Sequence, residues 1–347
     1  MFEPIDNTKQ YDHNWLVKEE GQRMTVAEKA TETGADFDVV YHPVGYVEDS
    51  RFIQPVYKDG KYKGEPRDRY IVRADNGSVL GVHSGKYPER EGYSHVFNTL
   101  EELFPNACSN ITVFGEGERV VVEQELDEPI SIGDGDEIQP YLYTRMSLNG
   151  SWKTETIPMH KRLACENMLG HTGQLFGVRA TSRHDQLLSM RARVVDLAVA
   201  QGETLVRMAQ VLSNQEFADE QFKRMVDEIM PYPTPVNGEP VHTNTLDAAL
   251  KKRSALFSGW TMESSDYGNN MWAAYNAAQG AEQHRINKGY KDTPASNQRS
   301  INRALEGKTP IADAASEYLA RVAVDDPFIT RDSNSKTVWM DTLLRIG

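Results

Sequence analysis

The sequence lacks any long hydrophobic run: no stretch of apolar residues approaches the ~18 that a transmembrane helix needs. The opening segment, MFEPIDNTKQYDHNW, has no basic region followed by an apolar stretch. We therefore expect neither a signal peptide nor a membrane partner.

Cysteine is also scarce. The chain has only Cys108 and Cys165, which lie 57 positions apart. This excludes a disulfide framework and a cysteine-rich metal knuckle. The composition is typical of a protein that stays in a reducing cytoplasm.

Motifs for nucleotides, metals and nucleophilic catalysis are missing. The segment from Gly81 to Tyr87 resembles a phosphate loop, but its glycines are one residue too close and Tyr87 replaces the Ser or Thr that binds Mg²⁺. GEGE at 115–118 lacks the last glycine of a dinucleotide fingerprint and predicts a hairpin turn. No His pair has HExxH or HxH spacing, and no GxSxG occurs. We expect no cofactor, and an enzyme is less favoured than a binding protein.

The 347 residues are enough for about two domains. The pattern predicts an α+β fold, in which an antiparallel β-hairpin sheet core packs on a long helix and is followed by a helical C-terminal half. The expected units are an N-terminal arm (1–65), an α+β core (66–230), a Pro-rich linker (231–241), a helical C-terminal domain (242–324) and a tail (325–347).

Strand pairs are predicted at three glycine-containing turns. Asn76-Gly77 joins RYIVRAD to SVLGVHS, Gly115-Glu116-Gly117 joins two further strands, and Asn149-Gly150 joins IQPYLYTRMSL to SWKTETIP. Before them, DFDVVYHPV is extended, and its proline restricts it to a sheet edge or a strand end. LFGVRATS is a further short strand.

Helices are predicted where caps and apolar spacing of three or four coincide. The first has Thr25 as its cap, Glu28 three residues on and Gly34 at its end. The expected helices are 25–33, 92–104, 159–169, a long one at 185–214, 215–230, 243–260, 269–284 and 310–323.

Charge is unevenly distributed along a chain of net charge −13. Residues 116–137 hold nine acidic side chains and one basic, whereas 160–193 hold six basic and two acidic, and 283–308 are basic again. Such runs are commonly solvated faces. The alternative is that the basic segments line a groove for a phosphate backbone, and that the acidic hairpins meet the basic patch of a neighbouring subunit.

Four segments together resemble the phage- and plasmid-encoded family catalogued as domain of unknown function 932. They are DFDVVYHPV, the hairpin RYIVRADNGSVLGVHSGKYPERE, HKRLACENML with an Arg-x-x-Cys-x-Asn pattern, and NNMWAAYNAAQGAEQHR with a Trp-x-x-x-Asn-Ala pattern. The hairpin departs from the family at His83 and at Glu89-Arg90, where the family often has Val-Gln.

The resemblance implies a mobile-element protein in the cytoplasm of an infected or plasmid-bearing bacterial host. Its order of elements is similar to the core of the single-strand annealing proteins, the RecT and Red-beta recombinases and the eukaryotic RAD annealing protein. By that analogy the chain is a bacteriophage-type recombination protein. It forms a homo-oligomeric ring or filament that anneals single-stranded DNA without nucleotide hydrolysis. Its further partner is a phage exonuclease or a single-strand-binding protein.

Annealing requires cations for phosphates and rings for stacking. The candidate residues are Lys161, Arg162, Arg179, Arg183, Arg191 and Arg193, with Tyr70, Arg73 and Tyr87 on the hairpin. For each tyrosine, sheet packing is the alternative.

Two other classes of function stay open. One is a mobile-element enzyme or anti-host factor, which would use the polar cluster Cys165, Asn167, His171 and His184. The other is a structural or assembly protein of the virion.

Overall fold

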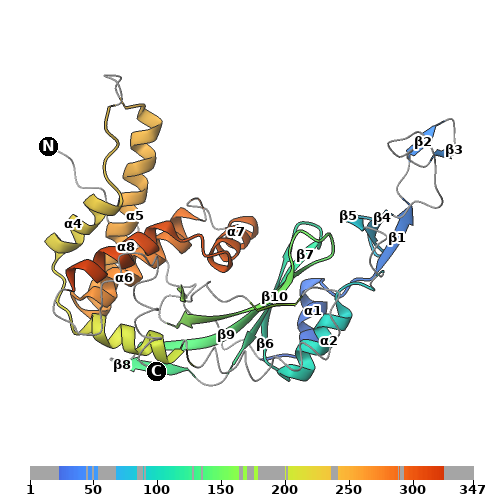
Figure 1. The fold of residues 1–347 in the computed structure, drawn as a ribbon, viewed down its shortest axis with the longest axis horizontal. Helices are drawn as coiled ribbons and strands as arrows, with labels where there is room; N and C mark the ends of the chain where they lie inside the picture. The colour runs from blue at the N-terminus through green and yellow to red at the C-terminus, as the bar shows by residue number, and fades with distance from the viewer. Residues whose placement is uncertain are drawn as a thin grey trace.

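The protein is seen in a computed structural model (Figure 1). The structure describes residues 23–43, 46–48, 51–53, 68–83, 89, 91–126, 129–133, 136–163, 167–169, 176–178, 200, 202–235, 241–287, 289 and 293–323. Helices and antiparallel sheets together confirm the predicted α+β class.

The main sheet has seven antiparallel strands in the order β11-β10-β9-β7-β6, with β12 beside β10 and β8 beside β9. The turns predicted at 115–117 and 149–150 join β6 to β7 and β9 to β10. The strands are β6 (Cys108–Phe114), β7 (Arg119–Glu125), β8 (Ile130–Gly133), β9 (Asp136–Ser147), β10 (Thr154–Arg162), β11 (Met168–Leu169) and β12 (Phe176–Val178).

A smaller three-stranded sheet, which we call the wing, consists of β1 (Val39–Pro43), β4 (Arg69–Arg73) and β5 (Val79–His83) in the order β1-β4-β5. The hairpin predicted at Asn76-Gly77 is confirmed, because Gly77 has the positive φ of 76° that such a turn needs. β1 is an edge strand, as its proline predicts. Beyond the wing, β2 (Tyr46–Glu48) pairs with β3 (Arg51–Ile53).

Helices cover both faces of the main sheet. α1 (Val26–Thr33) and α2 (Ser94–Leu103) pack on the face that carries Val120 and Val122. Val121, which points the opposite way, packs under α7 (Pro294–Leu305). The predicted capping box of the first helix is present, with Thr25 and Glu28 bonded to each other's backbone N–H groups.

The C-terminal half is helical, as predicted. Residues 202–213, the described part of the predicted long helix, are helical as well. The helices are α4 (Asp219–Ile229), α5 (Thr243–Tyr267), α6 (Met271–Gly280), a π-helical turn η2 (Ala281–Ile286), α7 and α8 (Pro310–Val322). The prediction missed α7, although Thr293 caps it and Pro294 occupies its first turn.

The helix predicted at 159–169 is wrong. β10 continues through Pro158 to Arg162, paired with β9 along its whole length. Pro158 is tolerated because β12 pairs only with 154–156 of β10 and β11 only with 160–161. The proline thus lies between these two short neighbours, where the outer edge needs no N–H donor.

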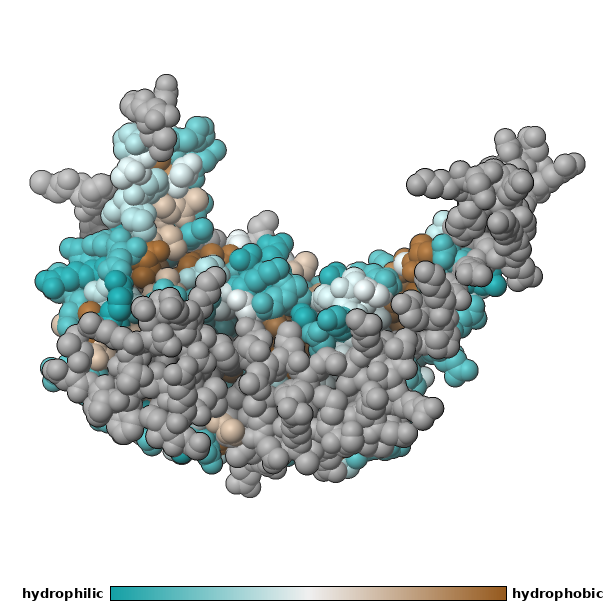
Figure 2. Space-filling model, viewed as in Figure 1, coloured by the Kyte–Doolittle hydropathy of each residue, from teal (hydrophilic) through white to brown (hydrophobic). Residues whose placement is uncertain are grey.

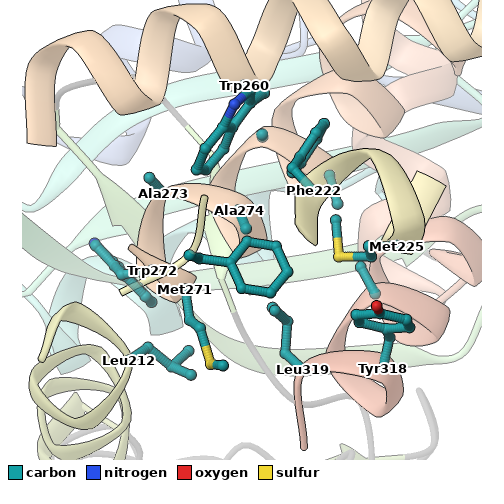
Figure 3. Packing of buried hydrophobic residues seen from close by; sticks show 14 of the residues in the cluster. Leu212, Phe222, Met225, Trp260, Met271, Trp272, Ala273, Ala274, Tyr318 and Leu319 are labelled. Atoms are coloured by element: carbon teal, nitrogen blue, oxygen red, sulfur yellow. The ribbon is translucent and has the colours of Figure 1, made fainter. Parts of the chain in front are cut away.

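The largest hydrophobic cluster joins the end of the sheet to the helices (Figure 3). Phe222 of α4 stacks on Trp260 of α5 with ring centroids 4.7 Å apart. Ile138 and Leu169 of the sheet belong to the same cluster. Residues on both sides of the Pro-rich segment 231–241 therefore share one core.

The molecule is a crescent with two projecting ends (Figures 1 and 2). The wing and the β2–β3 pair beyond it form one end. The other is formed by residues 232–235 and 241–250, which include the first two turns of α5. Within the described ranges, no helix combines the length and apolarity needed to cross a bilayer.

Phe222→Ala tests the shared core. Its ring is fully buried, so the substitution should lower the free energy of unfolding by about 3–5 kcal/mol. Denaturant unfolding measures this, with the exposed Val322→Ala on α8 as a control that changes it by less than about 0.5 kcal/mol. Equal effects of the two variants would contradict the shared core.

Candidate functional site

Arg162 lies inside the protein. Its Nε donates to both carboxylate oxygens of Asp136, at 2.9 and 2.7 Å, and its Nη1 donates to Glu263 Oε2 of α5 at 2.6 Å. The guanidinium carbon is 4.2 Å from the ring centroid of Tyr267. The side chain is 0% exposed, so this structure corrects the prediction that Arg162 faces a DNA phosphate.

Lys161 and Arg73 are also engaged within the chain. Lys161 pairs with Glu123. Arg73 donates to both oxygens of Asp75, at 2.9 and 2.6 Å, and lies 3.9 Å from the ring centroid of Phe37. Both cations therefore act first as structural contacts.

The acidic and basic segments meet within one chain. Glu123 and Asp136 belong to the acidic segment 116–137, and their partners Lys161 and Arg162 belong to the basic segment 160–193. For these pairs, the contact predicted between subunits is intramolecular.

Tyr70 lies on β4 of the wing, opposite His42 of β1 and Val82 of β5. It is half-buried, and its role in DNA binding stays a prediction. The other predicted residues lie outside the described ranges: Tyr87, Arg179, Arg183, Arg191, Arg193, Cys165, His171 and His184.

Two sequence motifs, far apart in the chain, meet in a buried polar network. Asn167 Nδ2 donates to the backbone oxygen of Asn276 at 3.2 Å, and Asn276 Nδ2 donates to the oxygen of Trp272 at 2.9 Å. His284 Nε2 lies 3.0 Å from Asn167 Oδ1. Asn167 thus holds α6 and the π-helical turn against the end of the sheet.

Trp272 connects this network to Arg162. Its indole Nε1 donates to Asp136 Oδ2 at 3.0 Å, on the carboxylate that already binds Arg162. The Trp272 ring stacks on Tyr275 at 5.7 Å. Trp272 and Asn276 thus join α6 to the sheet and to Asn167.

A second buried carboxylate, Glu282, holds the start of α8. Its Oε2 accepts hydrogen bonds from the backbone N–H groups of Ile311 and Ala312, both at 2.9 Å. Burial raises the pKa of Glu282 to about 7, although these two N–H groups and the charge of Arg303 act in the opposite direction. The negative charge of Asp313 also raises the pKa of Glu282.

Burial also perturbs other titratable groups of the interior. Burial raises the pKa of Glu263, against the opposing charge of Arg162. Burial also raises the pKa of Cys108 to about 12, which leaves its thiol protonated and unreactive. Among the described side chains, no three His, Cys, Asp or Glu residues gather as metal ligands do.

A partly exposed aromatic and basic patch lies where α7 meets the sheet. Trp152, after the β9–β10 turn, has the guanidinium carbons of Arg119 and Arg145 at 5.0 and 5.8 Å from its ring centroid. Its backbone N–H and C=O both bond the Ser147 hydroxyl at 2.9 Å. The neighbouring Lys153 is exposed and has no ion-pair partner among the described residues. We call Arg119, Arg145, Trp152 and Lys153 the Trp152 patch.

The end of α7 adds charge beside this patch. Burial acts to raise the pKa of Glu306, but hydrogen bonds from Lys308 and Asn302 and the charges of Lys308 and Arg145 hold it below its ordinary value. Arg119 and Arg145 pair with Glu118 and Glu155, and Lys308 pairs with Glu306. The patch is therefore only weakly positive, and its distinctive feature is a tryptophan ring with two arginines beside it.

The sequence prediction missed this patch. Trp152-Lys153 directly follows the predicted Asn149-Gly150 turn, and an aromatic residue beside a lysine at a hairpin turn was the available signal. Arg119 and Arg145 carry no such signal, because only the pairing of β7 with β9 brings the two strands together.

Comparison with protein-family models finds a match to the family described as Domain of unknown function (DUF932), over residues 91–306. This range is more than half of the chain. The chain belongs to the DUF932 family. No curated protein matches it, and no solved structure does either.

The DUF932 match contains the whole buried network, from Asp136 through Asn167 to His284, and the Trp152 patch. The hairpin of the wing, which carries part of the resemblance seen in the sequence, precedes the matched range. The two motifs that meet in the structure are thus the ones that lie inside the family match.

Arg162→Met tests whether the network holds the sheet to the helices. The change leaves Asp136 and Glu263 buried without their cation, and should lower the free energy of unfolding by about 3–5 kcal/mol at neutral pH. The loss should shrink at acidic pH, because Glu263, whose pKa burial raises, then binds a proton and no longer needs the cation.

The matched control replaces all three charges, as Arg162→Met with Asp136→Asn and Glu263→Gln. It should recover much of the lost stability, because no unpaired charge remains. A loss below about 1 kcal/mol in the single variant would contradict the structural role.

Glu282→Gln tests the buried carboxylate. The folded-state pKa of about 7 lies above the ordinary 4.5, so the folded protein binds the proton more tightly than the unfolded chain. Stability should therefore fall as pH rises from about 4.5 through 7. The amide mimics the protonated acid, so the variant should lack this decline and exceed the wild type above pH 7. Parallel stability curves for the two proteins between pH 4.5 and 8 would show that the pKa of Glu282 is not raised in the folded protein.

Proposed function

We propose that this DUF932 protein binds and anneals single-stranded DNA as a homo-oligomer, without nucleotide hydrolysis. The observation that carries the proposal is the Trp152 patch, in which two guanidinium groups lie 5.0 and 5.8 Å from the centroid of a partly exposed tryptophan ring, beside an exposed lysine. The resemblance of the element order to single-strand annealing proteins supports the same function.

The chemistry of the patch suits a single strand. Every base has a π face, so stacking on an aromatic ring or a guanidinium plane is tolerant of sequence, as annealing requires. Two hydrogen bonds to Ser147 hold the Trp152 backbone, and the ring of Phe114 packs edge-on against the Trp152 ring at 5.2 Å, which positions it before DNA binds. The exposed Lys153 beside the ring attracts the backbone of the strand.

The phosphate contacts need cations that are not already engaged. Arg162, Lys161 and Arg73 pair with carboxylates of their own chain. We therefore assign the phosphates to Lys153 of the patch and to the remaining arginines of the basic segment, Arg179, Arg183, Arg191 and Arg193.

The biological setting is part of the same proposal. A protein that anneals single strands without ATP suits recombination of a phage or plasmid in the cytoplasm of its bacterial host. An exonuclease that generates single strands, or a single-strand-binding protein that covers them, is the partner such a reaction needs.

The test measures binding of a fluorescent single strand and annealing of complementary strands, both without ATP. Trp152→Leu should raise the dissociation constant about 5- to 150-fold because the base no longer stacks on an aromatic ring, whereas Trp152→Phe retains most of the affinity. Lys153→Ala should lower the slope of log affinity against log salt by about 0.7.

Two further variants test whether the effect of Lys153→Ala on the salt slope is specific to phosphate contacts. Lys223→Ala, at an exposed position of α4, is the matched control and should leave the slope unchanged. Arg179→Ala with Arg183→Ala should lower the slope by about 0.7 for each phosphate that is no longer neutralised. Wild-type affinity in a folded Trp152→Leu variant, or an absolute need for ATP, would overturn the proposal.

A further inference from the structure

A pocket lies where the first part of α5 faces the end of the π-helical turn η2. It has a volume of about 340 Å³ and is lined by Ile286 of η2 and by residues of α5. This volume is at the lower end of the ~300–1,000 Å³ that is typical of ligand sites in proteins. The lining residues from α5 are Asn244, Asp247, Ala248, Lys251 and Lys252.

The lining residues of α5 form one stripe along the helix. Their spacing, i, i+3, i+4, i+7 and i+8, places them on the same side of α5. Across the pocket, Ile286 is partly buried against the largest hydrophobic cluster. The pocket thus combines an apolar wall with a polar, charged stripe.

The cations of this stripe are not engaged within the chain. Lys251 is exposed and Lys252 is half-buried, and neither has an ion-pair or hydrogen-bond partner among the described residues. In this they differ from Lys161, which pairs with Glu123. Asp247 is the one carboxylate among the described lining residues. Two ammonium groups therefore outnumber one carboxylate, and the lining is net positive.

The chemistry of the lining suits a phosphate group. The ammonium groups and the amide of Asn244 supply N–H donors, and lysine is a common phosphate ligand because it acts as a point charge. Ala248 and Ile286 offer apolar surface to the sugar that adjoins a phosphate in a nucleic-acid backbone.

α7 connects this pocket to the Trp152 patch. The Ser300 hydroxyl of α7 donates to the backbone oxygen of Gln283 in η2 at 2.6 Å. Leu305, at the end of the same helix, belongs to the cluster against which Trp152 packs. α7 has 12 residues and is therefore about 18 Å long. Figure 1 shows α7 between α5 and β7.

We propose that the pocket between α5 and η2 holds a backbone phosphate of the bound single strand, with Lys251 and Lys252 as its cations. The inference rests on the proposed function and adds a contact of the strand on the helical half of the molecule. The strand then follows α7 from the Trp152 patch to the pocket. A free phosphate ion offers the same oxygens, so the experiment must separate the two sources.

Binding of a fluorescent single strand at several salt concentrations tests the pocket. Lys251→Ala with Lys252→Ala retains helix propensity and should lower the slope of log affinity against log salt by about 0.7, because one phosphate contact is lost. Asp247→Asn should raise the affinity, since it removes a negative charge beside the phosphate. Lys223→Ala, on α4 and outside the pocket, is the matched control and should change neither quantity.

Inorganic phosphate separates the two sources of the ligand. Compared with chloride at equal ionic strength, it should not raise the melting temperature of the wild type above that of the double lysine variant. Stabilisation of the wild type alone, together with an unchanged salt slope in the double variant, would assign the pocket to free phosphate and overturn the inference.

The two proposals fail in different ways. If Trp152→Leu weakens binding but the folded double lysine variant keeps the wild-type slope, only the pocket is refuted. If Trp152→Leu binds as the wild type does and the double lysine variant loses slope, the pocket is supported and the Trp152 patch is refuted. A wild type that binds no single strand would overturn both.

Discussion

The buried pairing of Arg162 with Asp136 and Glu263 is the interaction on which the architecture depends. Removing three charges from water is costly, and the cost is offset only when the geometry is good and the remaining hydrogen-bonding groups are satisfied. β10 extends to Arg162, which bonds Asp136, and α5 continues past its predicted end at Trp260 to Tyr267, so that Glu263 reaches the same guanidinium group. The Trp272 indole donates a further hydrogen bond to the Asp136 carboxylate. The sheet and the helical half are therefore joined by these ionic contacts as well as by a shared hydrophobic cluster.

This arrangement shows that part of the acidic segment 116–137 and part of the basic segment 160–193 pair with each other inside one chain. An acidic run and a basic run along the chain suggest surfaces for a neighbour or for a phosphate backbone, yet Glu123 and Asp136 neutralise Lys161 and Arg162 beside them. The surface features that remain are separate in position and in chemistry. An aromatic and basic patch lies where α7 meets the sheet, and exposed valines lie on the wing.

The elements that local sequence predicts correctly are those with local causes. Asn76-Gly77 and Asn149-Gly150 are turns because their own backbone preferences close a hairpin, and Thr25 with Glu28 begins a helix through bonds within four residues. The helix predicted at 159–169 fails for the opposite reason. Its segment is bounded by Pro158 and has no distinctive local signal, and pairing with β9 decides that it is a strand.

The class of fold, the hairpins and the resemblance that leads to the DUF932 family follow from the order of residues along the chain. The placement of the cations does not. Arg162 bonds carboxylates 26 and 101 positions away, and Asn167 bonds a residue 109 positions away. A sequence shows that such side chains are charged or polar, but whether they are buried or exposed depends on which distant partner the packed elements bring within hydrogen-bonding distance. Tertiary structure alone therefore decided that Arg162 is internal and that Trp152 lies beside Arg119 and Arg145.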